Sequence, residues 1–187
     1  MPALVFASQL ASLLAIVLVP GVMLIVVLKK GWMRRLAVPL DADATWRDGR
    51  PLFGPTKTWL GVVIYVGGAM IVAGILGHPD LGEWVAPVLR GPRSVAIGFL
   101  LGLVYVVGEL LNSFVKRRVG IASSTETTSR WRPVQRAADL ADGIVAVSVL
   151  LIALGSSPLL VAATALVGVA VHAGTDVVMH RLRLKSR

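Results

Sequence analysis

Two aspartates inside an apolar stretch are the residues of this chain best placed to do chemistry. Asp139 and Asp142 are three positions apart, so in a helix their carboxylates share one face. An acid at the bilayer centre costs roughly 2.5–3.5 kcal/mol on insertion scales, and it should face the bundle interior and have a partner. Two such carboxylates beside a basic rim can hold Mg²⁺, with phosphate oxygens and water completing the octahedron. The alternative is that they pair with Arg or Lys and fix helix packing.

A third acid belongs to a polar stripe on another apolar run. Glu109, Asn112, Ser113 and Lys116 recur at i, i+3, i+4 and i+7, so they line one helix face. A carboxylate, an amide, a hydroxyl and an ammonium in a row suit a site for a charged ligand. Interhelical hydrogen bonding is the alternative. Glu109 and the two aspartates all lie near the basic ends of their runs, so we expect them at similar depth.

The segment 52–61, Leu-Phe-Gly-Pro-Thr-Lys-Thr-Trp-Leu-Gly, precedes another apolar run. Backbone N–H groups and the helix dipole at a helix start favour a phosphate, which Lys57 would neutralise. The segment is not a Walker A loop, because Gly54 is too close to Lys57 and no strand precedes it. An ordinary interfacial loop with Thr58 as the N-cap and Trp59 at the membrane interface is the alternative, and the residues alone leave both open.

Three further polar residues, His172, Asp176 and His180, recur at i, i+4 and i+8. This spacing could form a metal-binding face. Interhelical hydrogen bonds near an interface are the more common role of such residues, and the sequence favours that interpretation.

The elements that position these residues must be apolar helices. The 187-residue chain is 56% hydrophobic and 16% charged, with net charge +9, no cysteine and a mean hydropathy of +0.78. A soluble domain is nearer a quarter charged. The composition excludes a disordered chain, a disulfide scaffold and any Cys nucleophile or thiolate metal site. The basic residues sit between long apolar runs, which argues against nucleic acid as a partner.

Five apolar runs are each near the ~20 residues that cross a ~30 Å hydrocarbon core. Of the 19 Lys and Arg residues, 17 lie in the segments 29–58 and 116–136 or in the C-terminal tail, which the positive-inside rule places in the cytoplasm. The sequence therefore predicts an all-α integral membrane protein, a single transmembrane domain over 1–187. It has five transmembrane helices, an outside N-terminus, a cytoplasmic C-terminus and a polar cavity facing the cytoplasm. The predicted spans are 3–28, 59–76, 94–115, 137–154 and 159–179.

Three motifs together resemble those of the CDP-archaeol synthase family. Residues 54–61, GPTKTWLG, are similar to its G-x-x-K-T-W-R-G loop, and 108–121, GELLNSFVKRRVGI, are similar to its G-D-L-x-x-S-F-x-K-R-R-x-G segment. Asp139-x-x-Asp142 stands where this family and the related phosphatidate cytidylyltransferases carry D-x-x-D. His172 also resembles the histidine of the family's final helix. The resemblance runs from about Leu52 to the end of the chain.

Two residues depart from the family's pattern. Leu60 replaces its Arg, which removes one candidate phosphate contact, and Glu109 replaces its Asp, which keeps the charge on a longer arm. These departures bear on the identity of the lipid substrate more than on the class of reaction.

The resemblance implies a Mg²⁺-dependent CTP:lipid-phosphate cytidylyltransferase of phospholipid biosynthesis. Its partners would be CTP, the bilayer and a membrane lipid phosphate, either an archaeal-type ether lipid or phosphatidate-like. It would be a multi-pass protein of the cell membrane with its active site facing the cytoplasm, and homo-oligomerisation is left open. The implied metal ligands are Asp139, Asp142 and Glu109. The implied catalytic residues are Lys57, Lys116 and Asp142. The implied residues binding CTP or lipid phosphate are Gly54, Thr58, Gly61, Asn112, Ser113 and Arg117.

Two other functions fit the sequence less well. CDP-alcohol phosphatidyltransferases carry D-x2-D-G-x2-A-R, and residues 139–146 match its opening. Val147 replaces the Arg and no second Asp pair follows, so their two-metal site would be incomplete. A small membrane carrier using the intramembrane acids should have polar residues through the full membrane depth. The outer halves of the runs are nearly devoid of ionisable groups, which favours a one-sided cytoplasmic cavity.

Overall fold

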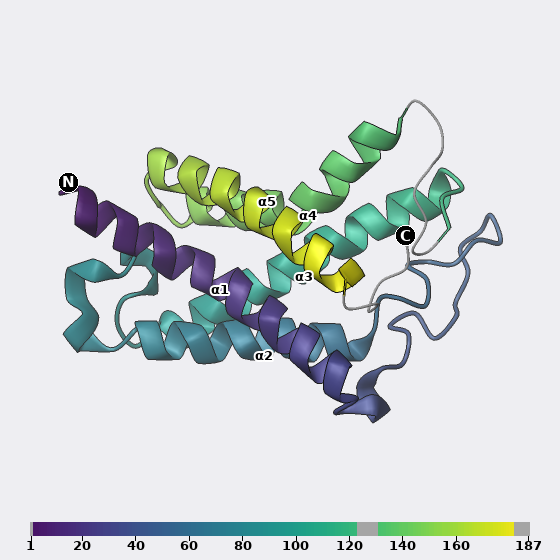
Figure 1. Cartoon of the computed structure of the whole chain (residues 1–187), viewed down its shortest axis with the longest axis horizontal. Coiled ribbons are helices and arrows are strands. Elements are labelled where there is room, and N and C mark those ends of the chain that lie inside the picture. Colours follow the sequence, from purple (N-terminus) through teal and green to yellow (C-terminus); the bar gives the residue numbers. More distant parts are fainter. Residues whose placement is uncertain (1, 123–130, 182–187) are drawn as a thin grey trace.

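The computed structural model describes residues 2–122 and 131–181, except for the side chains of residues 176, 179 and 180. Within these ranges the chain is helical and has no β-strand. Short 3-10 helices, η1 (Arg34–Leu36), η2 (Pro79–Trp84) and η3 (Pro87–Leu89), lie in the connections. The long helices are α1 (Ala3–Lys30), α2 (Trp59–Leu76), α3 (Ser94–Arg118), α4 (Arg132–Ala153) and α5 (Pro158–Arg181) (Figure 1).

Four of the described helices are long and apolar enough to cross a membrane, namely α1, α2, α3 and the Pro158–Thr175 part of α5. The predicted all-α membrane fold is confirmed at this level. α4 differs because its first half carries charges. Its helix begins at Arg132, before the apolar run predicted at 137–154, since Arg132 and Arg136 extend the helix without extending the apolar stretch.

The helix ends follow from local sequence. Gly31 ends α1 with φ 65°, in the left-handed region that favours glycine, and its N–H donates to the Leu28 carbonyl at 3.1 Å. Thr58 begins α2, because its Oγ1 accepts a hydrogen bond from the Gly61 N–H. The capping role of Thr58 is therefore confirmed, and it fixes where the preceding loop meets the helix.

Helix α3 packs against α2 on one side and α4 on the other. Glycines allow the close approach: a Cβ on Gly98 would lie 2.5 Å from the Ala69 carbonyl oxygen of α2. A Cβ on Gly108 would lie 2.6 Å from the Asp142 carbonyl oxygen of α4. The polar stripe of α3 is thereby brought against the helix that carries the two aspartates.

The molecule is apolar both inside and outside. Its core includes Leu13 of α1, Leu101 of α3 and Leu151 of α4, which are at most 3% exposed. Large apolar side chains also stand on outward helix faces, where Val149 is 65% and Leu166 75% exposed. Such outer surfaces suit contact with lipid tails, which are as apolar as the side chains themselves.

The long connection between α1 and α2 lies at one end of the molecule. Figure 1 shows this segment, 31–58, at the end where α3 finishes and α4 begins, far from the N-terminus. The loop motif, the end of the polar stripe and the start of the Asp-bearing helix therefore meet at the same end.

Candidate active site

The loop before α2 is attached to the end of α3. Arg117 Nε donates to the Phe53 carbonyl at 3.1 Å, and its guanidinium also donates to the Ile121 carbonyl. Within the loop, the Leu40 N–H donates to the Lys57 carbonyl at 2.8 Å. This attachment fixes the backbone of Lys57 beside α3. Further bonds between the loop and the end of α3 come from the side chains of Arg50 and Arg118.

Lys57 forms an ion pair with Glu109 of α3. The Nζ–Oε2 distance is 2.6 Å, and both side chains are about three-quarters buried, with 26% and 23% exposed. Burial alone would lower the pKa of Lys57, but the carboxylate of Glu109, helped by Asp142 and Asp139, raises it above its ordinary value. The side chain is therefore a charged ammonium at neutral pH, facing the interior of the bundle.

The two aspartates of α4 are joined by one side chain of α3. Asn112 Nδ2 donates to Asp139 Oδ1 at 2.7 Å and to Asp142 Oδ2 at 2.9 Å. Lys116, one turn further along α3, donates to both oxygens of Asp139 at 3.1 and 2.8 Å. Asp142 Oδ1 also accepts from the Gly143 N–H. The polar side chains of α3 and α4 therefore form one hydrogen-bonded network.

Other residues predicted for the site lie beside this network. Gly54 stands in the attached loop with φ 92°, and Gly61 donates its N–H to Thr58. Ser113 follows Asn112 on α3 and is buried. Arg117 bonds backbone carbonyls, so in this structure its guanidinium secures the loop. Phosphate binding by these residues stays a prediction.

The fit of a metal to the acids rests on the aspartate pair. Within the described part of the chain, no group of three His, Cys, Asp or Glu residues is arranged to hold a metal ion. Asp139 and Asp142 nevertheless place one oxygen each within 2.7 and 2.9 Å of the same nitrogen. Carboxylates that converge on one nitrogen can converge on one small cation, whose remaining positions phosphate and water would fill. Glu109 is engaged with Lys57 instead.

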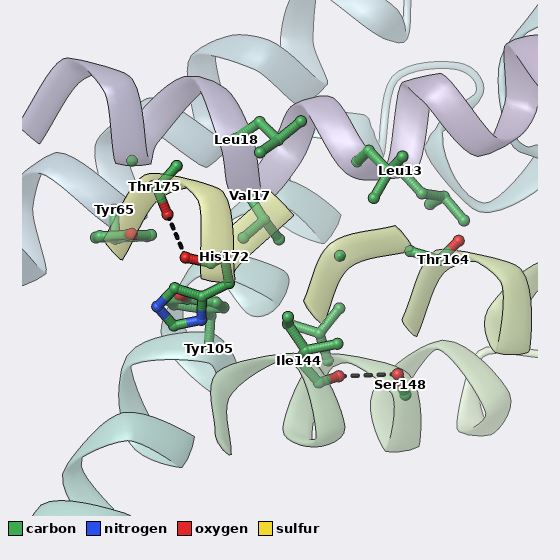
Figure 2. A pocket seen from close by; sticks show the side chains of 14 residues that line it. Leu13, Val17, Leu18, Tyr65, Tyr105, Ile144, Ser148, Thr164, His172 and Thr175 are labelled. Carbon is green, nitrogen blue, oxygen red and sulfur yellow. Dashed lines mark hydrogen bonds between the residues drawn. The ribbon is translucent and has the colours of Figure 1, made fainter. Parts of the chain in front are cut away.

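An apolar cavity adjoins the network. It has an empty volume of about 530 Å³, including space open to the surroundings. Figure 2 shows Leu13, Val17 and Leu18 of α1 on one side, and Ile144 of α4 on the other. His172, Tyr65 and Tyr105 line its polar end (Figure 2).

His172 approaches α4 through its Nδ1, which lies 3.1 Å from the Leu140 carbonyl oxygen. This contact agrees with the interhelical hydrogen bonding that the sequence favoured. The side chains of Asp176 and His180 lie outside the described residues, so the proposed metal-binding face of α5 stays untested.

Sequence reasoning missed two tyrosines and one aspartate. Tyr65 of α2 and Tyr105 of α3 stack with ring centroids 4.7 Å apart and planes 10° apart, and Tyr105 also interacts with Glu109. The i, i+4 spacing of Tyr105 and Glu109 was an available signal. Asp41, which bonds the loop backbone, had no such signal because its partners are 12 and 13 residues away.

Comparison with solved structures finds a similar fold. A solved chain described as an intramembrane enzyme for archaeal membrane lipids biosynthesis superposes with a TM-score of 0.59. It has 19% sequence identity, and the match covers 87% of this chain and 91% of that chain. At this identity the likeness concerns the fold alone.

Comparison of sequences is more specific. The CDP-archaeol synthase of Pyrococcus abyssi is 39% identical over 87 residues, 44% of this chain and 47% of that protein, so this match spans about half of the relative's length. The CDP-archaeol synthase of Hyperthermus butylicus is 31% identical over 152 residues, 79% of each chain. The model of one family, CarS-like: CDP-archaeol synthase, matches residues 36–187, which include every residue of the polar network. This chain therefore belongs to the CDP-archaeol synthase family.

Proposed function

We propose that this protein is a cytidylyltransferase that converts CTP and a membrane lipid phosphate to a CDP-lipid and pyrophosphate. An oxygen of the lipid phosphate attacks the α-phosphorus of CTP, and a new phosphoanhydride bond forms. The bond between the α- and β-phosphates breaks, and pyrophosphate leaves with its electron pair. One observation carries the proposal: a loop, α3 and α4 bring two ammonium groups, an amide and three carboxylates together at one end of an apolar bundle. Family membership supports the same reaction.

Lys57 and Lys116 are the groups that would neutralise the phosphates. Such a transfer needs positioning and charge neutralisation more than covalent chemistry by the protein. Each ammonium is already held by a carboxylate and would exchange it for a phosphate oxygen when CTP enters. Asn112 would then orient the aspartates.

Asp139 and Asp142 would hold Mg²⁺. Bound Mg²⁺ would supply positive charge to the triphosphate oxygens. Their convergence on the Asn112 nitrogen supports this assignment, whereas Glu109 is better placed to orient Lys57. Mg²⁺ dependence is tested directly by chelation, as described below.

The apolar cavity would take part of the lipid. Its lining is apolar apart from a few hydroxyls and His172, and its polar end adjoins Glu109 through Tyr105. A lipid whose chain entered there would carry its phosphate toward the network.

The membrane arrangement is part of the proposal. α4 would be a fifth span, with the partly buried Asp139 and Asp142 toward the bundle interior and its start, with the exposed Arg132 and Arg136, at the cytoplasmic surface. The N-terminus would lie outside and the active site would face the cytoplasm of the cell that makes the protein. The concentration of Lys and Arg in 29–58, 116–136 and the tail supports this orientation.

The deciding experiment follows the fate of each phosphate of CTP. The purified protein is incubated in mixed micelles with Mg²⁺ and a panel of ether-linked and ester-linked lipid phosphates. Label in the α-phosphate should appear in the lipid, and label in the γ-phosphate should appear only in pyrophosphate. EDTA should stop the reaction and added Mg²⁺ should restore it. Absence of α-label in every lipid tested would overturn the proposal, and γ-label in the lipid would reassign the enzyme to phosphoryl transfer.

A further inference from the structure

Asp41 is a buried acid in the loop between α1 and α2, outside the network of Lys57, α3 and α4. Asp41 is only 8% exposed. The same oxygen, Oδ2, accepts the Phe53 N–H at 2.8 Å and the Gly54 N–H at 2.9 Å. Burial raises the pKa of Asp41, but these backbone donors, with the Asp43 N–H, bring it below its ordinary value. The charged carboxylate of Asp41 therefore accepts hydrogen bonds from two adjacent backbone amides of the 52–61 loop.

The two backbone groups of Phe53 are held from opposite sides. Its N–H is held by Asp41, and its carbonyl accepts from Arg117 of α3. The next residue, Gly54, accepts the Lys57 N–H at 3.2 Å through its carbonyl. A short chain of bonds therefore runs from Asp41 to the backbone of Lys57.

The segment around Asp41 also pairs directly with the far end of the motif loop. The Leu40 N–H donates to the Lys57 carbonyl at 2.8 Å, and the Trp59 N–H donates to the Val38 carbonyl at 3.2 Å. Lys57 is thus flanked by bonds to residues 38–41 on both sides. From this backbone position its ammonium reaches Glu109, with an Nζ–Oε2 distance of 2.6 Å.

We infer that Asp41 is a positioning residue, whose carboxylate fixes the 53–57 turn so that Lys57 is aimed at Glu109 and at the incoming phosphates. In the described part of the chain, the hydrogen bonds of the Asp41 carboxylate go to backbone N–H groups of the loop, so Asp41 acts through the loop backbone. This inference rests on the proposed function for its catalytic consequence, but not for its structural content.

The kinetic test is a double-mutant cycle between Asp41 and Lys57. In Asp41→Asn one side-chain oxygen can still accept hydrogen bonds, but the new N–H₂ group faces a backbone N–H donor. We therefore expect kcat/KM for CTP to fall about tenfold, which is the loss typical of one charge-assisted hydrogen bond. In a Lys57→Ala background the same change should cost less than about twofold, because interacting residues are not additive. A matched control is Asp43→Asn, an exposed acid two residues away, which should stay within about twofold of the unchanged protein.

A second measurement needs no substrate. Hydrogen exchange of the unchanged protein should show the Phe53 and Gly54 amides protected although they lie in a loop, and Asp41→Asn should speed their exchange and the amine labelling of Lys57. Fast exchange of both amides in the unchanged protein would overturn the inference, and this result remains decisive if Asp41→Asn does not fold. Equal losses from Asp41→Asn with and without Lys57 would also overturn it. Protected amides in a protein that transfers no cytidylyl group would instead remove the proposed function and leave the positioning intact.

Discussion

One amide nitrogen, that of Asn112, is shared by the two aspartates of α4. Two carboxylates side by side in a medium of low polarity repel each other strongly. An N–H₂ group or a cation between them relieves that repulsion. Under the proposed assignment, a divalent cation between the same two oxygens would relieve the repulsion in the same way.

Asparagine at either aspartate should separate catalysis from folding. Asp139→Asn and Asp142→Asn each remove the charge while keeping size and hydrogen-bonding capacity, so we expect turnover to fall to background while the protein still inserts and elutes as a single species. Cytidylyl transfer and size-exclusion chromatography are the measurements, with the exposed Asp80→Asn as control. Substantial activity in both variants would make the pair structural, and loss of folding in either would favour a packing role.

Lys57 should matter for CTP more than for stability. Lys57→Ala removes a charge-assisted hydrogen bond of roughly 1.5–3 kcal/mol if the ammonium contacts phosphate, which corresponds to about a ten- to hundredfold loss in kcat/KM. Lys57→Arg should recover part of it, because the guanidinium is larger and directional. Steady-state kinetics at saturating lipid phosphate measure both, with Lys29→Ala at the exposed end of α1 as control. Unchanged efficiency in Lys57→Ala would take the loop out of the active site.

At the scale of elements, the helices could be predicted because each apolar run is near the ~20 residues that cross a membrane as a helix. α2 has the predicted bounds, 59–76, and α1 and α5 extend the predicted runs by only a few residues. α4 is the exception. It begins at Arg132, whereas the apolar run alone places its start at residue 137. Apolar periodicity locates what lies in lipid, whereas helix propensity decides where a helix begins.

The site was predictable to the extent that its parts are local. Glu109, Asn112 and Lys116 share a helix face by spacing alone, and the structure places them toward Lys57 and the two aspartates. Glu109 lies in the same network as the two aspartates, and its ion pair is with Lys57. Asp41 and the Tyr65–Tyr105 stack depend on contacts between distant segments, which no spacing rule encodes.

The contact between α3 and α4 should be sensitive to a single methyl group. A Cβ on Gly108 would lie 2.6 Å from the Asp142 carbonyl oxygen, so Gly108→Ala must push α4 away and should cost about 1–3 kcal/mol with loss of activity. Gly67→Ala is the matched control, because a Cβ there meets nothing within 4 Å and the helix should gain up to ~1 kcal/mol. Thermal unfolding in detergent measures both. Equal stability of the two variants would show that the helices are not in tight contact.

At the scale of the whole molecule, the basic residues are concentrated in a few segments of the chain. Seventeen of the 19 basic residues fall in three segments, and two of those segments border the polar network. The distribution suits the proposed substrates, a soluble anion and a membrane anion, because the positive segments would attract CTP to the membrane surface.

The orientation can be tested with reporters. A reporter fused after Arg187 and expressed in a bacterial inner membrane should be active only as a cytoplasmic reporter, because the basic segments resist translocation. The matched fusion before Met1 should be active only outside. Periplasmic activity of the C-terminal fusion would contradict the five-span arrangement, and four spans would place both ends on one side.

Lys57 pairs with Glu109 and Lys116 pairs with Asp139, so each of these lysines already has an internal counter-ion. Without nucleotide, each ammonium is already matched, so a free anion of low charge gains little by displacing a carboxylate at 2.6–2.8 Å. In the proposed reaction, a polyanion that engages both lysines at once and brings a cation for the aspartates would offset the two exchanges. In the proposed reaction, the same carboxylates would pair with the lysines again when pyrophosphate leaves. The carboxylates would thereby set a threshold for substrate entry and assist the exit of product.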